Sequence, residues 1–223
     1  MVALPWLATM LTSNPLLIAA VATAQRLPWL LFALPAGVWT DRADRRLLMA
    51  RADLMRMVLM AFTLLMVISH TALPVPEGSG NAAILSLALI AFLFGSAEVI
   101  RDNAAQTVLP SIVAHSDLER ANGQMWSAEQ VTGQFIGPPI AGLLIASSVA
   151  LPFGVDASIY ALSAALIWMI ALPPRKSTVS ARFLPALLEG LGWMRRNPLI
   201  LRLAIMLGAI NAVFIGGMTI LVL

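Results

Sequence analysis

The residues best suited to do chemistry in this chain form three groups, and the first is a short charged run. Its residues follow the spacing G-x-x-x-D-R-x-x-R-R and are Gly37, Asp41, Arg42, Arg45 and Arg46. The glycine near a helix end permits close backbone approach. One turn later a carboxylate meets several guanidinium groups, and such a cluster pairs differently in two conformations, as a switch requires. A plain basic loop at a membrane surface explains the same residues equally well.

The second group lies in an apolar stretch and combines small residues with prolines. Its spaced residues are Gly133, Gly137, Pro138 and Gly142, and a second proline follows at Pro139. Small residues four positions apart let helices pack backbone to backbone. The two prolines remove backbone donors and bend a helix. The pattern predicts a bent helix with a packing groove, whatever the function.

The third group consists of polar residues inside apolar stretches: Gln25, Arg26, Glu98, Glu129 and Gln134. Arg26 comes 11 residues after Pro15, about 17 Å into its helix at 1.5 Å per residue. We expect it to be the basic residue nearest the bilayer centre, where a charge is costly and marks function. Lining of a cavity is the first interpretation, in which Arg26 attracts anionic groups of a substrate or holds a carboxylate. Glu98 and an acidic residue in the missing part of the first helix are equally good candidates for that carboxylate. An ion pair that only holds the fold and a misplaced helix boundary are the alternatives. For Glu98 and Glu129, a solvated helix end explains the charge as well as a proton or substrate role.

Composition limits what such residues are for. The chain has 223 residues, 60% of them hydrophobic and 11% charged, against about 25% charged in soluble domains. A soluble enzyme, a nucleic-acid binder and a disordered regulator are therefore excluded. There is no cysteine and only two histidines, His70 and His115, so the sequence predicts neither metal nor thiol chemistry and no cofactor. It also lacks the G-x-x-x-x-G-K-S/T run that binds ATP phosphates.

Apolar stretches predict an all-α, polytopic membrane protein of about seven transmembrane helices, the first one truncated. A spanning helix needs about 20 apolar residues. Six stretches qualify: Pro15 to Val38, Leu47 to Ile68, Ala82 to Ile100, Val131 to Val149, Pro152 to Leu172 and Leu199 to Leu223. A shorter one, Val2 to Leu11, has half that length. We expect both chain ends to be cut from longer helices.

Local punctuation supports these boundaries. Asn14 before Pro15 is a typical N-cap with proline at the first helical position. Ser116 and Glu119 have the spacing of a capping box, so the fifth helix is expected to begin before the membrane. The stretch from Arg182 to Arg196 has apolar residues at helical spacing and predicts an amphipathic helix.

Basic residues alternate from loop to loop. They collect between the second and third, the fourth and fifth, and the sixth and seventh expected helices; they include Arg42, Arg45, Arg46, Arg51, Arg101, Arg120, Arg175, Lys176, Arg182, Arg195 and Arg196. The intervening loops carry no lysine or arginine. Because basic loops stay in the cytoplasm, the pattern predicts a cytoplasmic N-terminus. It also explains the net charge of +3 without nucleic acid as a partner.

The charged run at 37–46 resembles the loop signature of the major facilitator superfamily, at the same helix number and on the same side. The helix-five group is similar to the G-x-x-x-G-P-x-x-G-G pattern of exporters in that superfamily, with Ala141 in place of one glycine. Residues 27–32, 101–110 and 156–158 resemble the macrolide-efflux and enterobactin-exporter branch. The resemblance implies two six-helix bundles around a central cavity. Residues 1–172 would be the N-terminal bundle, 173–198 a cytoplasmic linker, and 199–223 the first helix of a second bundle whose remainder is absent.

The function expected from these features is alternating-access secondary transport, as an exporter of drug-like or siderophore-like small molecules. The expected partners are the lipid bilayer, the substrate, protons or another coupling ion, and the missing C-terminal helices. The expected place is a plasma membrane of the bacterial inner-membrane type. A membrane-embedded enzyme or assembly subunit is the alternative, but it would need polar residues clustered at one depth, which the sequence does not display. A fragment that transports nothing is the third hypothesis.

Overall fold

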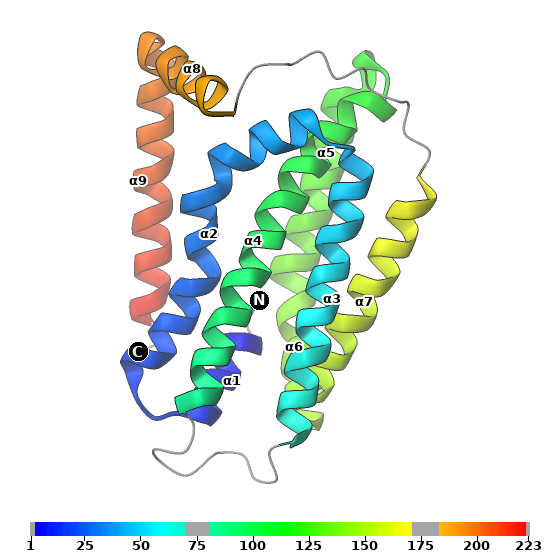
Figure 1. Cartoon of the computed structure of the whole chain (residues 1–223), viewed down its shortest axis with the longest axis vertical. Coiled ribbons are helices and arrows are strands. Elements are labelled where there is room, and N and C mark those ends of the chain that lie inside the picture. Colours follow the sequence, from blue (N-terminus) through cyan, green and yellow to red (C-terminus); the bar gives the residue numbers. More distant parts are fainter. Residues whose placement is uncertain (1–2, 70–80, 171–182, 222–223) are drawn as a thin grey trace. The chain divides into compact units, whose positions relative to one another are not determined.

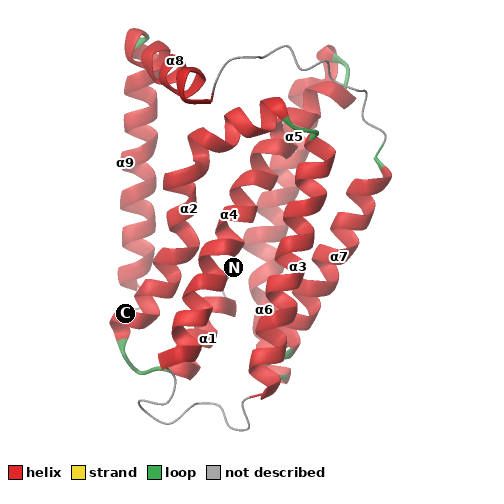
Figure 2. Cartoon of the chain, in the orientation of Figure 1, coloured by secondary structure: helices red, strands yellow, loops and turns green. Residues whose placement is uncertain are grey.

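The computed structural model describes residues 3–69, 81–170 and 183–221, and helices make up nearly all of these (Figures 1 and 2). The chain divides into two units, residues 1–177 and 178–223, which are described separately here. The helices of the first unit are α1 (Ala3–Leu11), α2 (Pro15–Arg42), α3 (Arg45–Ser69), α4 (Asn81–Ile112), α5 (Leu118–Gln130), α6 (Gly137–Ser147) and α7 (Leu151–Met169). A 3-10 turn, η1 (His115–Asp117), precedes α5, and a π-helical segment, η2 (Val131–Ile136), joins α5 to α6. The second unit contains α8 (Phe183–Arg196) and α9 (Pro198–Leu221).

Four described helices are long and apolar enough to cross a membrane, namely Pro15–Asp41, Arg45–Ser69, Ala82–Ile112 and Leu151–Met169. Their outer surfaces are apolar: Leu30 is 82% exposed, Leu65 64% and Leu85 66%. A soluble bundle would bury such side chains, whereas a bilayer solvates them. The prediction of an all-α, polytopic membrane protein is confirmed.

One of the two helix caps predicted from the sequence is present in the structure, and the other is not. The Asn14 side chain accepts a hydrogen bond from the Leu16 N–H at 2.9 Å, as the Asn-Pro pair predicts. The capping box predicted for the fifth helix is wrong. The turn η1 occupies its place, so the cap of α5 is Asp117, which makes no side-chain capping bond. The predicted amphipathic helix is present as α8.

The core of the first unit lies where α1, α2, α3, α4 and α7 meet. Leu7, Val21, Met60, Leu87 and Phe153, one from each of these helices, are buried together there. The most extensive helix pairs are α2 with α4, and α3 with both α7 and α4 (Figure 1). As a result, α3 is held between α4 and α7, and side chains from all three meet in the middle of the bundle.

Helix α2 crosses α4 at very short range. A Cβ added at Gly95 of α4 would overlap the carbonyl oxygen of Gln25 and lie 3.2 Å from Cγ of Pro28. Only glycine leaves room for this approach. The close helix crossing is therefore between α2 and α4, not at the helix-five glycines.

The expected fifth spanning helix is interrupted rather than straight. Pro138 and Pro139 have no N–H, so the regular i→i−4 ladder cannot continue through them. The N–H of Gly137 instead bonds to the Thr132 carbonyl, five residues back, which makes η2 a π-helical turn. None of the described residues of α5, η2 and α6 is buried.

Candidate functional site

The centre of the bundle contains an ion pair on α3 that a serine of α7 binds by a hydrogen bond. Asp53 is 1% exposed and Arg56, one turn later on α3, is 8% exposed. Nη1 of Arg56 donates to Oδ1 of Asp53 at 3.3 Å. The Ser163 hydroxyl of α7 donates to Oδ2 of the same carboxylate at 2.6 Å. Both oxygens of Asp53 are therefore bonded, which offsets the cost of burying its charge.

Two aromatic rings hold the Arg56 guanidinium from the flanking helices. Its carbon lies 4.8 Å from the ring centroid of Phe94 on α4 and 4.4 Å from that of Tyr160 on α7. The two rings meet edge to face, with centroids 5.6 Å apart. Cation–π contacts of this kind become stronger when the cation is desolvated. Arg56 thus contributes contacts to α3, α4 and α7 at once.

Two further carboxyl groups lie within reach of this guanidinium charge. Glu98 on α4 is 4% exposed, and among basic side chains the charge of Arg56 acts on it most strongly, with Arg26 next. Asp156 on α7 is half-buried and also within range of Arg56. Within the described residues, neither Glu98 nor Asp156 takes part in a hydrogen bond or ion pair through its carboxyl group.

The cluster lies at mid-membrane depth. Arg56 is about 17 Å from the start of α3 at 1.5 Å per residue, and that helix has 25 residues. Arg26 is therefore not alone at this depth, because Arg56 is equally far into its helix, and Arg56 is buried. The expectation that no polar cluster gathers at one depth is wrong. Asp53 and Ser163 are 110 residues apart in the chain, so their meeting was not visible from spacing.

The residues expected around Arg26 separate in the structure. Gln25 is 5% exposed and its carbonyl faces Gly95, whereas Arg26 is exposed. Among the described residues, no ion pair joins Arg26 to Glu98. Glu129 and Gln134 are exposed on α5 and η2, away from the buried cluster.

The charged loop ties the start of α3 to the ends of two other helices. Nη1 of Arg45 donates to the Thr107 carbonyl of α4, and Nη1 of Arg46 donates to the Ile170 carbonyl after α7 at 3.2 Å. Asp44 caps α3 by accepting from the Leu47 N–H at 3.1 Å. Guanidinium groups at helix C-termini also complement the helix dipole.

Gly37 near the end of α2 makes no close approach to a neighbouring helix. Asp41 is exposed, and no atom of a neighbouring helix comes within 4 Å of a Cβ placed at Gly37. The side chain of Arg42 lies outside the described residues. The loop arginines therefore bind helix-end carbonyls, while the predicted exchange of ion-pair partners stays a prediction.

The helix-five glycines divide into two kinds. A Cβ at Gly133 or Gly142 would meet nothing within 4 Å. A Cβ at Gly137 would lie 2.9 Å from the Thr132 carbonyl inside the π turn. Gly137 therefore serves the local backbone, and no described helix fills the groove predicted from the other two.

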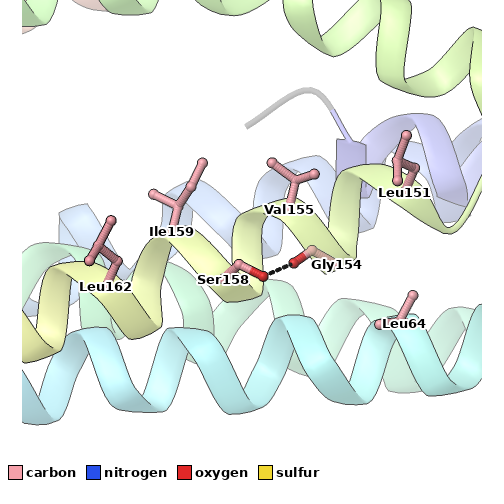
Figure 3. Close-up of a pocket in the computed structure, with 7 residues that line it drawn as sticks. All are labelled: Leu64, Leu151, Gly154, Val155, Ser158, Ile159 and Leu162. Atoms are coloured by element: carbon pink, nitrogen blue, oxygen red, sulfur yellow. Dashed lines mark hydrogen bonds between the residues drawn. The ribbon is translucent and has the colours of Figure 1, made fainter.

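A shallow groove of about 570 Å³ runs between α3 and α7 (Figure 3). Leu64 contributes from α3, and the other lining residues lie on α7 between Leu151 and Leu162. The Ser158 hydroxyl bonds to the Gly154 carbonyl of its own helix at 2.8 Å. The groove is therefore apolar and suits a lipid-facing surface better than a polar substrate.

Comparison with known families decides the class of this membrane protein. Residues 1–223 match the family described as "Transmembrane secretion effector", of the major facilitator type. The chain belongs to this family. Comparisons with curated proteins and with solved structures gave no match. The protein is therefore a membrane transporter of the major facilitator type and not an enzyme.

Sequence reasoning missed the buried Asp53–Arg56 cluster although one signal was present. Asp53 and Arg56 are three residues apart inside an apolar helix, which is the spacing of an i,i+3 ion pair. Both residues lie within the stretch from Leu47 to Ile68 that was expected to span the membrane, and neither was among the polar residues singled out from the sequence. Tyr160 and Ser163 gave no signal of their own, since single polar residues are common in membrane helices.

Proposed function

We propose that the chain belongs to a proton-driven exporter that moves drug-like or siderophore-like small molecules by alternating access. The observation that carries the proposal is Glu98, a carboxyl that is buried at mid-bundle, has no ion pair among the described residues, and lies within electrostatic range of Arg56. Carboxyls inside membrane spans are rare and mark proton relays.

The chemistry of this arrangement suits proton exchange. A neutral Glu98 is tolerated in the apolar interior, while an ionised one needs a nearby cation. Arg56 is that cation, but Asp53 and two rings already hold it. Taking up or losing a proton at Glu98 therefore changes the forces on an arginine that binds three helices together. A two-state element of this kind is what coupling requires.

Export, rather than uptake, rests on the helix-five resemblance at Gly133, Gly137, Pro138 and Gly142. These glycines belong to η2 and α6, where a Cβ at Gly133 or Gly142 meets nothing within 4 Å. This exposed surface is available to the C-terminal helices that would complete the central cavity. We assign gating to the loop, where Arg45 and Arg46 hold the ends of α4 and α7. Release of these carbonyl contacts would let the cytoplasmic ends of the helices separate.

We also propose that the protein lies in a bacterial-type inner membrane with its N-terminus on the cytoplasmic side, on the basis of the loop charges. The chain has no cysteine, so single cysteines report position cleanly. A cysteine at Ser116, in the turn η1 between α4 and α5, should react with a membrane-impermeant maleimide only in inside-out vesicles. A cysteine at Ser148, between α6 and α7, should react only in right-side-out cells. The reverse pattern would contradict the orientation.

The experiment that tests the function uses inside-out membrane vesicles and two probes, radiolabelled erythromycin and iron-free enterobactin. An acidic vesicle interior should drive uptake of at least one probe, and nigericin should abolish that uptake. Glu98→Gln should lose uphill uptake but retain exchange of probe across the membrane without a gradient. The matched control is Glu119→Gln, an exposed carboxyl on α5 that should behave as wild type. Full uphill uptake by Glu98→Gln, or wild-type uptake unaffected by nigericin, would overturn the proposal.

A further inference from the structure

Asp156 is an acidic residue that the proposed function does not use. It is half-buried on α7, four residues before Tyr160, and therefore on the same helix face. Tyr160 carries the ring on which the Arg56 guanidinium rests at 4.4 Å. A carboxyl one turn from that contact, inside a membrane span, calls for an explanation beyond packing.

Helix directions place this carboxyl opposite Glu98. Helices α4 and α7 run the same way along the bundle, and α3 runs against both (Figure 1). Glu98 comes four residues after the ring of Phe94, and Asp156 comes four residues before the ring of Tyr160. At 1.5 Å per residue, Glu98 is about 6 Å from Phe94 along α4, and Asp156 is about 6 Å from Tyr160 along α7 in the opposite direction. Along the bundle axis, the rings that hold Arg56 therefore lie between the two acidic residues, whose backbone positions differ by about 12 Å.

Arg56 has hydrogen-bonding capacity left to serve a second partner. A guanidinium has five N–H donors. One bonds to Asp53, and Nε is buried without a hydrogen-bond partner in the described structure. The rings of Phe94 and Tyr160 contact the guanidinium through cation–π interactions, at 4.8 and 4.4 Å from its carbon to the ring centroids. Asp53, fixed by Ser163, anchors one end of the group.

We propose that Asp156 is a second proton-binding site and that Arg56 is the counter-ion which Asp156 and Glu98 share. This inference rests on the proposed function, in which Glu98 carries the coupling proton. In the proposed orientation, Asp156 lies toward the outside and Glu98 toward the cytoplasm. A proton that binds Asp156 removes its negative charge, which leaves Arg56 to stabilise an ionised Glu98. Glu98 then releases a proton, so one proton is taken up and one is given off.

Other charged groups also affect the protonation of Glu98 and Asp156. Asp102 and Arg26 act on Glu98 from α4 and α2. Asp53 lies beside Arg56 on α3. Helix α1 carries no charged residue, and α6, which contacts α7, carries none either. The amino terminus of the chain acts on Asp156 more strongly than Arg56 does, and Arg56 is the cation that acts on Asp156 among the described side chains.

The test exploits Tyr160, which is the chain's one tyrosine. Tyrosine labelled with ¹³C in the ring gives a signal from this position alone, beside Arg56 and one turn from Asp156. The chain in lipid nanodiscs is titrated with pH, without substrate or gradient. We expect two steps in the Tyr160 chemical shift. Asp156→Asn should remove one step, Glu98→Gln should remove the other, and the control Asp117→Asn, exposed at the start of α5, should keep both.

If Asp156 and Glu98 share Arg56, removal of one carboxyl must also shift the titration midpoint of the other. The step that remains in Asp156→Asn should move by at least ~0.5 pH unit, about threefold in proton affinity. A single step in the wild type, or two steps that survive Asp156→Asn, would overturn the second site. An unmoved remaining step would overturn the shared counter-ion. If Asp156→Asn does not fold, Asp156→Glu retains the carboxyl and should keep both steps, with the midpoint of one displaced; an unchanged pair of midpoints would count against the site.

Failure of the proposed function gives a different result. Two coupled steps in nanodiscs, combined with normal uphill uptake by Glu98→Gln in vesicles, would retain the two proton sites and reject their role in transport. Loss of uptake in Glu98→Gln, combined with one step in the titration, would retain proton-driven transport and reject Asp156.

Discussion

Replacement of Gly95 by alanine tests the close crossing of α2 and α4. The added Cβ would overlap the Gln25 carbonyl oxygen, with the Gln25 carbonyl carbon at 3.1 Å and Pro28 Cγ at 3.2 Å. Two of these three atoms are backbone, and the third belongs to a rigid ring, so none of them can turn aside. The helices α2 and α4 must move apart, and that pair forms one of the most extensive contacts in the bundle.

The size of the effect follows from a comparison of two glycines. Gly→Ala inside a helix gains about 1 kcal/mol from helix propensity. Overpacking costs about 1–3 kcal/mol, and a clash with backbone belongs at the upper end. Gly123 in α5 has nothing within 4 Å of the position of a Cβ, so Gly123→Ala measures the propensity gain alone. The difference between Gly95→Ala and Gly123→Ala should be about 3 kcal/mol, or roughly 6–12 °C in Tm for a chain of this length.

The assay is thermal unfolding in detergent, followed by far-ultraviolet circular dichroism at matched protein and detergent concentrations. Gly95→Ala should melt below wild type, and Gly123→Ala at or above it. Equal Tm values for the two alanine variants would refute the close crossing of α2 and α4 and, with it, the helix placement that buries Gln25.

Two further substitutions test local features by the same thermal assay. Gly137→Ala should melt roughly 2–4 °C below Gly142→Ala, because a Cβ at Gly137 lies 2.9 Å from a carbonyl in the π turn and a Cβ at Gly142 meets nothing; equal values would show that the turn is not π-helical. Ser163→Ala should lower the free energy of unfolding by about 1–2 kcal/mol because the buried Asp53 loses its 2.6 Å hydrogen bond. Ser158→Ala should lower it less because that hydroxyl bonds only within its own helix. The opposite order of the two variants would contradict the cluster.

Helix positions were predictable from the sequence because each depends on local signals. The Asn14 cap and the amphipathic helix α8 each depend on residues that lie close together in the sequence. Likewise Pro138 and Pro139 predicted a bend. They did not predict a π turn, because that depends on which carbonyl the Gly137 N–H reaches. The capping box failed for a similar reason, since η1 competes for the same backbone groups.

Contacts between helices were much less predictable. Gly95 is a single glycine without a repeat, so nothing in its own helix indicated the approach of α2. The link from Asp53 to Ser163 depends on how α3 and α7 face each other. The position of Arg26 was also only partly predictable. Its depth along the helix follows from the sequence, but depth does not determine that its side chain is exposed.

Proton movement during transport tests the central proposal most directly. Proteoliposomes loaded with the pH dye pyranine receive erythromycin, or iron-free enterobactin if that is the transported probe, without an imposed gradient. Wild-type protein and the Glu119→Gln control should move protons against the probe, with a dye signal that rises with the amount of probe transported. Glu98→Gln should move the probe down its gradient with no proton signal. Probe transport without any proton signal in wild type, or an undiminished signal in Glu98→Gln, would contradict the account.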